Sequence, residues 1–297
     1  MFNNPPMCGG TSKSYDENAP KEIKSEDMTL FKIETALTPM GVMVGSQGAA
    51  PVKTAWFRFI SVYAAKCESG VFVLLYAHNR NDKKEFGWSY IKDDIFPELV
   101  SAVNNYNLAK SNGSHSFTYG LPENFGGEVR VDYSSGERID FSTNRNPVIS
   151  VDFAVWLYDF FSEALKKESV ELPDASKIKT IRFDLKRSGG GYTHIVLTQN
   201  GDVCSYSRER KFDFPDIYKD EKELPSELMD KFRGIINDNA MSVWHMLPES
   251  GFDAIEEKSM TFVFDDGTEI FVPNNRSLPA TISGAFFNIE LELDSNN

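Results

Sequence analysis

The sequence has little of the material from which metal sites and disulfide frameworks are built. It contains three cysteines and four histidines in 297 residues. Cys8, Cys67 and Cys204 show no Cys-x-x-Cys spacing, so neither a disulfide scaffold nor a structural zinc site is predicted. The histidines stand alone, without a second ligand at the spacing that a metal site needs. We therefore expect no metal, no cofactor and a reducing compartment.

The sequence also lacks positive charge. It carries 31 Lys and Arg against 44 Asp and Glu, which gives a formal net charge of −13. A nucleic-acid partner requires a basic face that releases counterions from phosphates, and no cluster of lysines and arginines stands out in the sequence. We therefore expect no nucleic-acid partner. The composition, 41% hydrophobic and 25% charged, is typical of a soluble globular protein.

Long apolar runs are missing as well. No segment reaches the roughly 20 residues of a membrane-spanning helix, and the first residues lack the basic and apolar regions of a signal peptide. We therefore expect a cytoplasmic protein. One observation keeps an alternative open, because Cys8-Gly9-Gly10 is followed by a polar stretch. This arrangement resembles the start of a mature lipoprotein and would indicate an extracellular protein if the natural N-terminus lay upstream.

Two stretches of the sequence, by contrast, repeat one pattern. "VRVDYSSGERIDFSTNR" and "MTFVFDDGTEIFVPNNR" each consist of two apolar-alternating runs around a glycine turn, and each ends on Asn-Arg. The turn glycines, Gly136 and Gly267, lie 131 positions apart. Ser-Gly or Asp-Gly between alternating runs is typical of a β-hairpin turn. The sequence therefore predicts two equivalent hairpins.

Further matches in the same order indicate an internal repeat. Some have the same offset as the hairpins and others a slightly smaller one, and we interpret the difference as a change in loop length after a duplication. The matches are Gly70 with Gly201 at an offset of 131, and Leu121-Pro122-Glu123 with Leu247-Pro248-Glu249 and Phe160-Phe161 with Phe286-Phe287 at 126.

Each copy is predicted to contain three strands, a helix, a hairpin and a final helix, because β-branched and aromatic runs alternate with amphipathic segments. The predicted fold class is α+β, a tandem duplication of a β-β-β-α-β-β-α module with antiparallel sheets and helices on one face. The last segment, "FFNIELELD", alternates as a strand would, and is assigned as a helix by analogy with the first copy. The other predicted strands are 29–37, 56–64 and 71–78 in the first copy and 179–187, 193–199 and 203–209 in the second, with helices near 95–110 and 226–240.

The domain boundaries follow from the repeat and from changes in composition. Residues 1–24 are predicted to be a disordered tail, residues 25–168 the first repeat, residues 169–176 a linker, and residues 177–297 the second repeat. The first copy carries a Gly/Pro/Ala-rich insertion at 38–54 that has no counterpart in the second. Such an insertion is either slack on the surface or a mobile lid.

Candidate binding residues come from two patterns. Asn144-Arg145 and Asn275-Arg276 follow the two hairpins in equal register. Asn is common at turns and helix caps, and the alternative is that the two arginines together bind a carboxylate. In "EFGWSY", the side chains of Phe86, Trp88 and Tyr90 share one face of a strand or turn. That face is either core or a surface for a partner or ligand.

No catalytic residues are assigned by the sequence. Cys204 and His194 lie on neighbouring predicted strands, but nothing nearby would activate the thiol. The favoured function is a non-enzymatic protein that recognises a protein or peptide partner through a surface at a pseudo-twofold axis between the repeats. The alternative is a small-ligand-binding protein or hydrolytic enzyme with a site between the repeats, using Cys204 and His194 or the Asn-Arg pairs.

Overall fold

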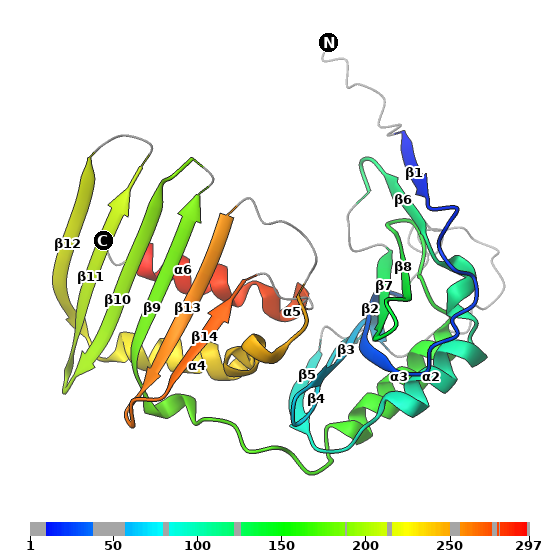
Figure 1. Ribbon diagram of the computed structural model, residues 1–297, viewed down its shortest axis with the longest axis horizontal. Coiled ribbons are helices and arrows are strands. Elements are labelled where there is room, and N and C mark those ends of the chain that lie inside the picture. Colours follow the sequence, from blue (N-terminus) through cyan, green and yellow to red (C-terminus); the bar gives the residue numbers. More distant parts are fainter. Residues whose placement is uncertain are drawn as a thin grey trace. The chain divides into compact units, whose positions relative to one another are not determined.

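The computed structural model shows a mixed α/β protein with two sheets whose strands are mostly antiparallel (Figure 1). The chain divides into two compact units between Val170 and Glu171, inside the segment predicted as linker. No helix in the described ranges combines the length and apolar character needed to cross a membrane. The structure describes residues 10–37, 57–79, 83–121, 126–187, 189–212, 216–249, 256–274, 278 and 280–295.

The first unit contains an eight-stranded sheet in the order β1-β6-β8-β7-β2-β3-β4-β5. Only the short β6–β8 pairing is parallel among its neighbouring strands. The strands are β1 (Thr11–Tyr15), β2 (Met28–Ala36), β3 (Phe57–Cys67), β4 (Gly70–Asn79), β5 (Lys84–Ile91), β6 (Ser114–Thr118), β7 (Gly127–Tyr133) and β8 (Arg138–Thr143), and the helices are α2 (Phe96–Asn105), the short 3₁₀ helix η1 (Leu108–Ser111) and α3 (Val151–Ala164).

The core of the first unit lies between the sheet and helices α2 and α3, which cover one face (Figure 1). Alternate strand residues point to this face, so Phe31, Val62 and Val73 are fully buried. The ring of Phe31 stacks on that of Phe161 of α3, with 6.2 Å between centroids. Helix α3 begins where the side chain of Ser150 accepts a hydrogen bond from the Phe153 N–H, as expected of an N-cap serine.

The second unit contains a six-stranded antiparallel sheet in the order β12-β11-β10-β9-β13-β14. Helices α4 and α6 lie on one face of it (Figure 1). The strands are β9 (Ile178–Arg187), β10 (Tyr192–Asn200), β11 (Val203–Lys211), β12 (Ile217–Pro225), β13 (Glu256–Phe264) and β14 (Glu269–Pro273), and the helices are the 3₁₀ helices η3 (Ala175–Lys177) and η4 (Met241–Met246), α4 (Glu227–Asp238), α5 (Ala280–Ser283) and α6 (Ala285–Ser295).

Apart from β1, each unit has four strands before its first long helix, not the predicted three. The missed strands are β5 and β12, which occupy the edges of their sheets. An edge strand has one neighbour and more contact with solvent, so it does not need the continuous apolar pattern used for the prediction. In β12 most side chains are charged, and for the segment of β5 that contains Gly87 the sequence predicts only a strand or turn. The final helix of the chain, α6, is confirmed as a helix.

The two predicted hairpins are confirmed, and they agree in their hydrogen bonds. In the first, the Gly136 N–H donates to the Tyr133 carbonyl and the Tyr133 N–H donates to the Glu137 carbonyl, each at 3.0 Å. In the second, the corresponding distances are 3.1 Å from the Gly267 N–H to the Phe264 carbonyl and 2.9 Å from the Phe264 N–H to the Thr268 carbonyl. The two glycines have φ values of 85° and 86°, a left-handed conformation that favours glycine.

Two of the other matched pairs of residues do not occupy equivalent positions in the structure. Gly201 lies in the two-residue turn between β10 and β11, whereas Gly70 is already in β4, paired with Cys67. Gly70 is needed for space, because a Cβ there would lie 2.3 Å from the Ile91 carbonyl oxygen. Phe161 is fully buried, whereas its match Phe287 is 61% exposed. The Leu121-Pro122-Glu123 match falls partly outside the described residues.

The first unit also has strands that the sequence analysis missed. Residues 1–24 were predicted to be a disordered tail, but Thr11–Tyr15 form β1, which pairs with β6. The buried Asn112 fixes the following segment, because its side-chain amide donates to the carbonyls of Pro20 at 2.9 Å and Arg138 at 2.7 Å. Serine- and threonine-rich strands such as these lack the apolar alternation that the prediction relied on. The insertion at 38–54 lies outside the described residues.

Candidate functional site

The aromatic row predicted from "EFGWSY" lies on the edge strand β5. Phe86, Trp88 and Tyr90 point to the sheet face opposite the helices, since the alternating residue Ile91 belongs to the helix-covered core. Their exposure falls along the strand, from 44% at Phe86 through an intermediate value at Trp88 to 3% at Tyr90. The row is therefore core at one end and surface at the other.

The buried end of the row is anchored by β4. The ring of Trp88 lies 6.2 Å from that of Phe72, and Phe72 in turn contacts the ring of Tyr63 at 5.9 Å. The hydroxyl oxygen of Tyr90 accepts a hydrogen bond of 3.1 Å from the Ser69 N–H in the β3–β4 turn. These contacts hold the strand and leave Phe86 as its most exposed aromatic side chain.

The other face of β5 is fixed by helix α3. The hydroxyl of Tyr158 donates a hydrogen bond to the Glu85 carboxylate. Partial burial and this bond raise the pKa of Tyr158 above its usual value. A Cβ at Gly87 would lie 3.0 Å from a methyl group of Leu165, so glycine allows the end of the helix to approach the strand.

The outer backbone edge of β5 is partly open. The segment after α3 covers one end, where Ser169 forms an antiparallel bridge with Ile91 and the Val170 N–H donates to the Tyr90 carbonyl at 2.6 Å. Because backbone groups alternate in direction along a strand, the outward N–H and C=O groups are those of Tyr90, Trp88 and Phe86. In the described part of the chain, β5 has no strand partner on this outer edge beyond the bridge to Ser169, whereas its inner edge pairs with β4.

A network of ionic groups lies on the same sheet face, over β2 and β7. Lys32 contacts the carboxylates of Glu34 at 3.1 Å and Glu128, and the hydroxyl of Ser61 donates to Glu34 at 3.0 Å. Burial raises the pKa of Glu34, whereas Lys32 lowers that of Glu128 against the effect of burial. One ammonium group thus lies between two carboxylates, so Lys32 joins β2 to β7 and offsets part of the negative charge of the network.

This network was not found from the sequence, although a signal for it existed. In "MTLFKIETA", Lys32 and Glu34 alternate with the buried Phe31 and Ile33, which places both charges on one face. Their partner Glu128 comes from a strand almost a hundred positions later. Only the pairing of β2 with β7, in which Glu34 is opposite Glu128, brings the groups together.

Asn144 has a structural role in the first unit. Its buried side chain accepts a hydrogen bond from the Thr118 N–H at 2.7 Å and donates one to the Thr118 carbonyl at 3.0 Å, so it continues the sheet where β6 ends. Arg145 is exposed, and its backbone N–H donates to the hydroxyl of Thr143 at 3.2 Å. Asn275 and Arg276 lie outside the described residues, and a pair of arginines binding a carboxylate stays a prediction.

Cys204 and His194 do not form a reactive pair. Cys204 is fully buried on the helix side of the sheet, and burial raises its pKa. His194 is opposite Glu209 in the β10–β11 pairing, whereas Cys204 is opposite Gln199, and the two side chains point to different faces. The His194 ring instead contacts Asp184 at 2.7 Å. The thiol route considered for the hydrolytic alternative is therefore not supported.

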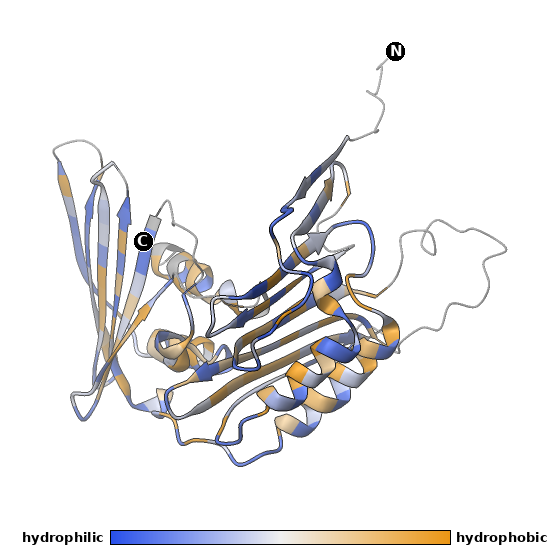
Figure 2. Ribbon diagram, turned by 45° about the vertical axis from the view of Figure 1, so that its right-hand side comes forward, coloured by the Kyte–Doolittle hydropathy of each residue, from blue (hydrophilic) through white to orange (hydrophobic). Residues whose placement is uncertain are grey.

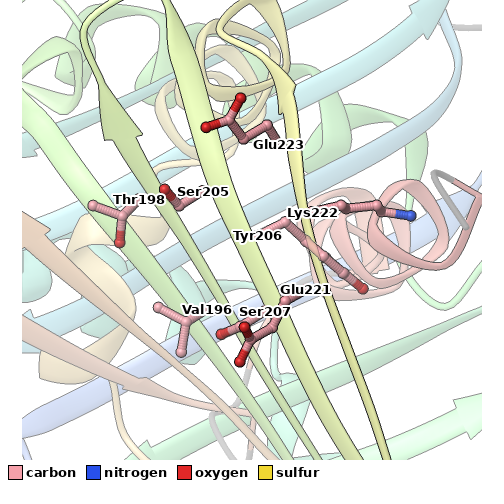
Figure 3. A pocket seen from close by; sticks show the side chains of 8 residues that line it. All are labelled: Val196, Thr198, Ser205, Tyr206, Ser207, Glu221, Lys222 and Glu223. Carbon is pink, nitrogen blue, oxygen red and sulfur yellow. The ribbon is translucent and has the colours of Figure 1, made fainter.

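A shallow hollow of about 430 Å³ lies over β10–β12 in the second unit (Figure 3). Ser205 and Ser207 face Glu223 and Glu221 across the β11–β12 pair. All four side chains are at least partly open to solvent, and they present hydroxyls and carboxylates without a buried polar group among them. In the parts of the chain that are described, no group of three or more His, Cys, Asp and Glu side chains is arranged to hold a metal ion.

Comparison with models of known protein families and with curated proteins found no match for this chain. Among the surfaces described above, the edge of β5 combines outward backbone groups with partly exposed aromatic side chains.

Proposed function

We propose that this protein binds a protein or peptide partner, and that an extended segment of the partner adds to the sheet of the first unit beside β5. The observation that carries the proposal is the partly open edge from Lys84 to Ser89, where the outward backbone groups belong to Phe86 and Trp88. Addition of a strand to an open sheet edge uses backbone hydrogen bonds for affinity and alternate side chains for specificity.

The linker supports this mode of binding because it already uses the same edge. Ser169 and Val170 pair with Ile91 and Tyr90 in antiparallel fashion over a very short stretch. A partner strand would continue this pairing toward Lys84. The partly exposed aromatic rings of Phe86 and Trp88 would then pack against every second side chain of the partner, and such rings contribute strongly to binding energy.

The corresponding edge of the second unit is less suited to a partner. Strand β12 carries Lys219, Asp220, Glu221, Lys222 and Glu223 in succession, and it ends on a proline. Charged side chains and proline on an edge strand oppose pairing with another chain. The aromatic edge of β5 is therefore the better candidate.

We also propose that the two units descend from a duplicated module. The order β8-β7-β2-β3-β4-β5 in one sheet corresponds to β14-β13-β9-β10-β11-β12 in the other. Both sheets have a register shift at the same place, where Thr29 of β2 and Lys179 of β9 are passed over in the pairing. Residues with positive φ, Asn107 and Ala240, precede the 3₁₀ helix in each unit.

Amide hydrogen exchange tests whether the edge is open. In the free protein, the amides of Phe86 and Trp88 should exchange rapidly, whereas those of Gly87 and Ser89, which point toward β4, should be protected. A peptide selected from a random display library for binding should slow exchange at Phe86 and Trp88. Equal protection of all four amides in the free protein would show that the edge is covered, and would contradict the proposal.

A pair of matched variants tests the role of the aromatic row. Phe86→Ala should weaken binding of the selected peptide by about tenfold or more, because an interface aromatic side chain typically contributes more than 1 kcal/mol. The control is Phe271→Ala, which removes a 57% exposed phenyl ring from the edge strand β14 of the second unit. If both variants bind the peptide as tightly as the original chain, β5 is not the binding edge.

A further inference from the structure

We infer that the second unit holds a binding site for an oxyanion, on the helix side of its sheet at the end that carries the β9–β10 and β11–β12 connections. We call this region the cationic end, and define it by Arg187, Thr193, Arg208, Arg210 and Lys258. The inference concerns a different unit from the proposed peptide edge and does not depend on it.

The strand pairing places these residues together. Thr193 of β10 is opposite Arg210 of β11 on one side and opposite Leu185 of β9 on the other. Leu185 is in turn opposite Lys258 of β13. Since residues directly opposite in a sheet project to the same face, Lys258, Leu185, Thr193 and Arg210 form one row across four strands.

The row lies on the helix side of the sheet. Thr193 alternates with the buried residues Ile195 and Leu197 of the core, and Arg208 is directly opposite Ile195. Arg187 follows Leu185 by two positions on β9 and therefore points the same way. Three arginines, a lysine and a threonine thus share one end of a single face.

Helix α6 does not reach this end. The hydroxyl of Tyr206, two positions before Arg208, donates to the carbonyl of Leu293 in the last turns of the helix at 3.5 Å. Both ribbon views show the ends of β9, β10 and β11 that carry these residues extending past α6 (Figures 1 and 2). The cationic side chains therefore lie beyond the apolar core that the helix covers.

Thr193 supplies the observation that points to a ligand. Its side chain is 3% exposed, and its hydroxyl oxygen is buried without a hydrogen-bond partner in the described part of the protein. Buried hydroxyl groups are nearly always satisfied, and an unsatisfied one calls for a water or ligand. A hydroxyl beside arginines can donate to an anion, as the guanidinium groups do.

The surrounding charges favour an oxyanion. Guanidinium groups bind carboxylate and phosphate oxygens in a planar, two-pronged geometry, and here they gather in a chain whose formal net charge is −13. One carboxylate shares this face, because Asp220 is directly opposite Arg208 in the β11–β12 pairing, and it lies 3.7 Å from the Lys222 ammonium. The arginines and Lys258 also make interactions within the chain, which would hold their side chains in place, and the Arg210 guanidinium lies 5.6 Å from the Phe212 ring centre.

The ligand is therefore inferred to be a phosphate group, either free or attached to a peptide. Inorganic phosphate is the first probe, titrated calorimetrically into the full chain at constant ionic strength. We expect saturable binding at one site. Thr193→Val and Arg210→Gln should each weaken it by about tenfold or more, since a hydrogen bond to a charged group is lost. The control is Arg182→Gln, on the opposite face of β9 where Arg182 pairs with Glu269 at 3.2 Å, and it should bind phosphate like the original chain.

Thermal unfolding keeps the inference testable if a variant is damaged. Without phosphate, Thr193→Val should unfold at the same temperature as the original chain or higher, because a methyl group replaces a hydroxyl that has no partner. With phosphate, only chains with an intact site should gain additional thermal stability beyond the salt effect common to all variants. A lower unfolding temperature for Thr193→Val without phosphate would show that the hydroxyl has a structural partner, and the inference would fail.

A second titration distinguishes the sources of the anion. A short phosphoserine peptide that binds more tightly than inorganic phosphate, with the same loss in the two variants, would identify a modified peptide as the ligand. Equal or weaker binding of the peptide would identify a free anion. Absence of saturable binding for both probes, or equal binding by Arg182→Gln and the two site variants, would overturn the inference.

Discussion

The two units of this protein share an order of six strands but use one face of their sheets differently. Leu75 of β4 is opposite Val62 of β3 in the first unit, and Arg208 of β11 is opposite Ile195 of β10 in the second. These are corresponding places in the two sheets. The first unit buries a leucine where the second carries a partly exposed arginine. Equivalent topology therefore does not require equivalent burial.

The difference follows from the helices that cover each sheet. In the first unit, α3 spans 14 residues and has a serine N-cap, and α2 lies beside it. In the second unit, the last helix spans 11 residues. On the helix side of a sheet, a side chain beyond the end of the covering helix has fewer apolar groups to pack against than one beneath it. The extent of the helical cover therefore influences which positions on that side are apolar.

Replacing each of these two side chains by the other should give the largest difference in stability between the units. Leu75→Arg would bury a charge in the covered core and should destabilise the first unit by about 4 kcal/mol or more. Arg208→Leu is the matched control and should change stability by less than about 1 kcal/mol. Denaturant unfolding measures both, with Trp244 as the sole tryptophan of the second unit and Trp88 and Trp156 reporting on the first. Similar losses in the two variants would show that both positions are equally covered.

Releasing the N-terminal segment of the first unit should have a smaller effect on stability. Asn112→Ala removes the amide that holds Pro20 and Arg138 and accepts the Asp140 N–H at 2.7 Å. Loss of these bonds should destabilise the first unit by about 3 kcal/mol and increase proteolysis before residue 28. The second unit has no such segment in its described part, so its unfolding should not change. Unchanged proteolysis would show that β1 and the segment after it are held by other contacts.

The two cysteines in the described residues allow the units to be compared by the reactivity of their thiols. Burial raises the pKa of Cys67 in the first unit to about 11. A raised pKa leaves less thiolate at a given pH, so near pH 8 iodoacetamide should label Cys67 about a hundredfold more slowly than an unperturbed thiol. Cys204 of the second unit has no exposed surface and should react only after unfolding. Mass spectrometry in a Cys8→Ser background measures both rates across pH 7 to 11, and a labelling midpoint at or below pH 9 for Cys67 would contradict its buried environment.

Local rules were sufficient to predict part of this structure from the sequence. The hairpins at Gly136 and Gly267 require a residue with positive φ between alternating runs, and both signals lie within a few residues. The strands of the cores and the amphipathic helices were predicted because their burial is periodic. Strand β12 was missed because its alternation is between charged residues, which carry no signal of burial.

The candidate sites depend on pairing between distant segments, which periodicity does not reveal. Phe86 and Trp88 could be assigned to one face from their spacing, but their position on an edge follows from the order of all eight strands. The cationic end needs the registers of β9, β10 and β11 to bring Arg187, Thr193 and Arg210 together. The match of Phe161 with Phe287 fails because adjacent residues of a helix project from different faces, and in α6 it is Phe286, at 6% exposure, that is buried rather than Phe287.

The short pairing of the linker with β5 has a mechanical consequence. Ser169 and Val170 are bound to the strand immediately before the chain enters the second unit at Glu171. Tension applied between the units would load these few hydrogen bonds before any strand of the sheets. Pulling would therefore detach the linker first and lengthen the bare backbone edge, so that a stretched chain would offer a partner a longer strand than a relaxed one.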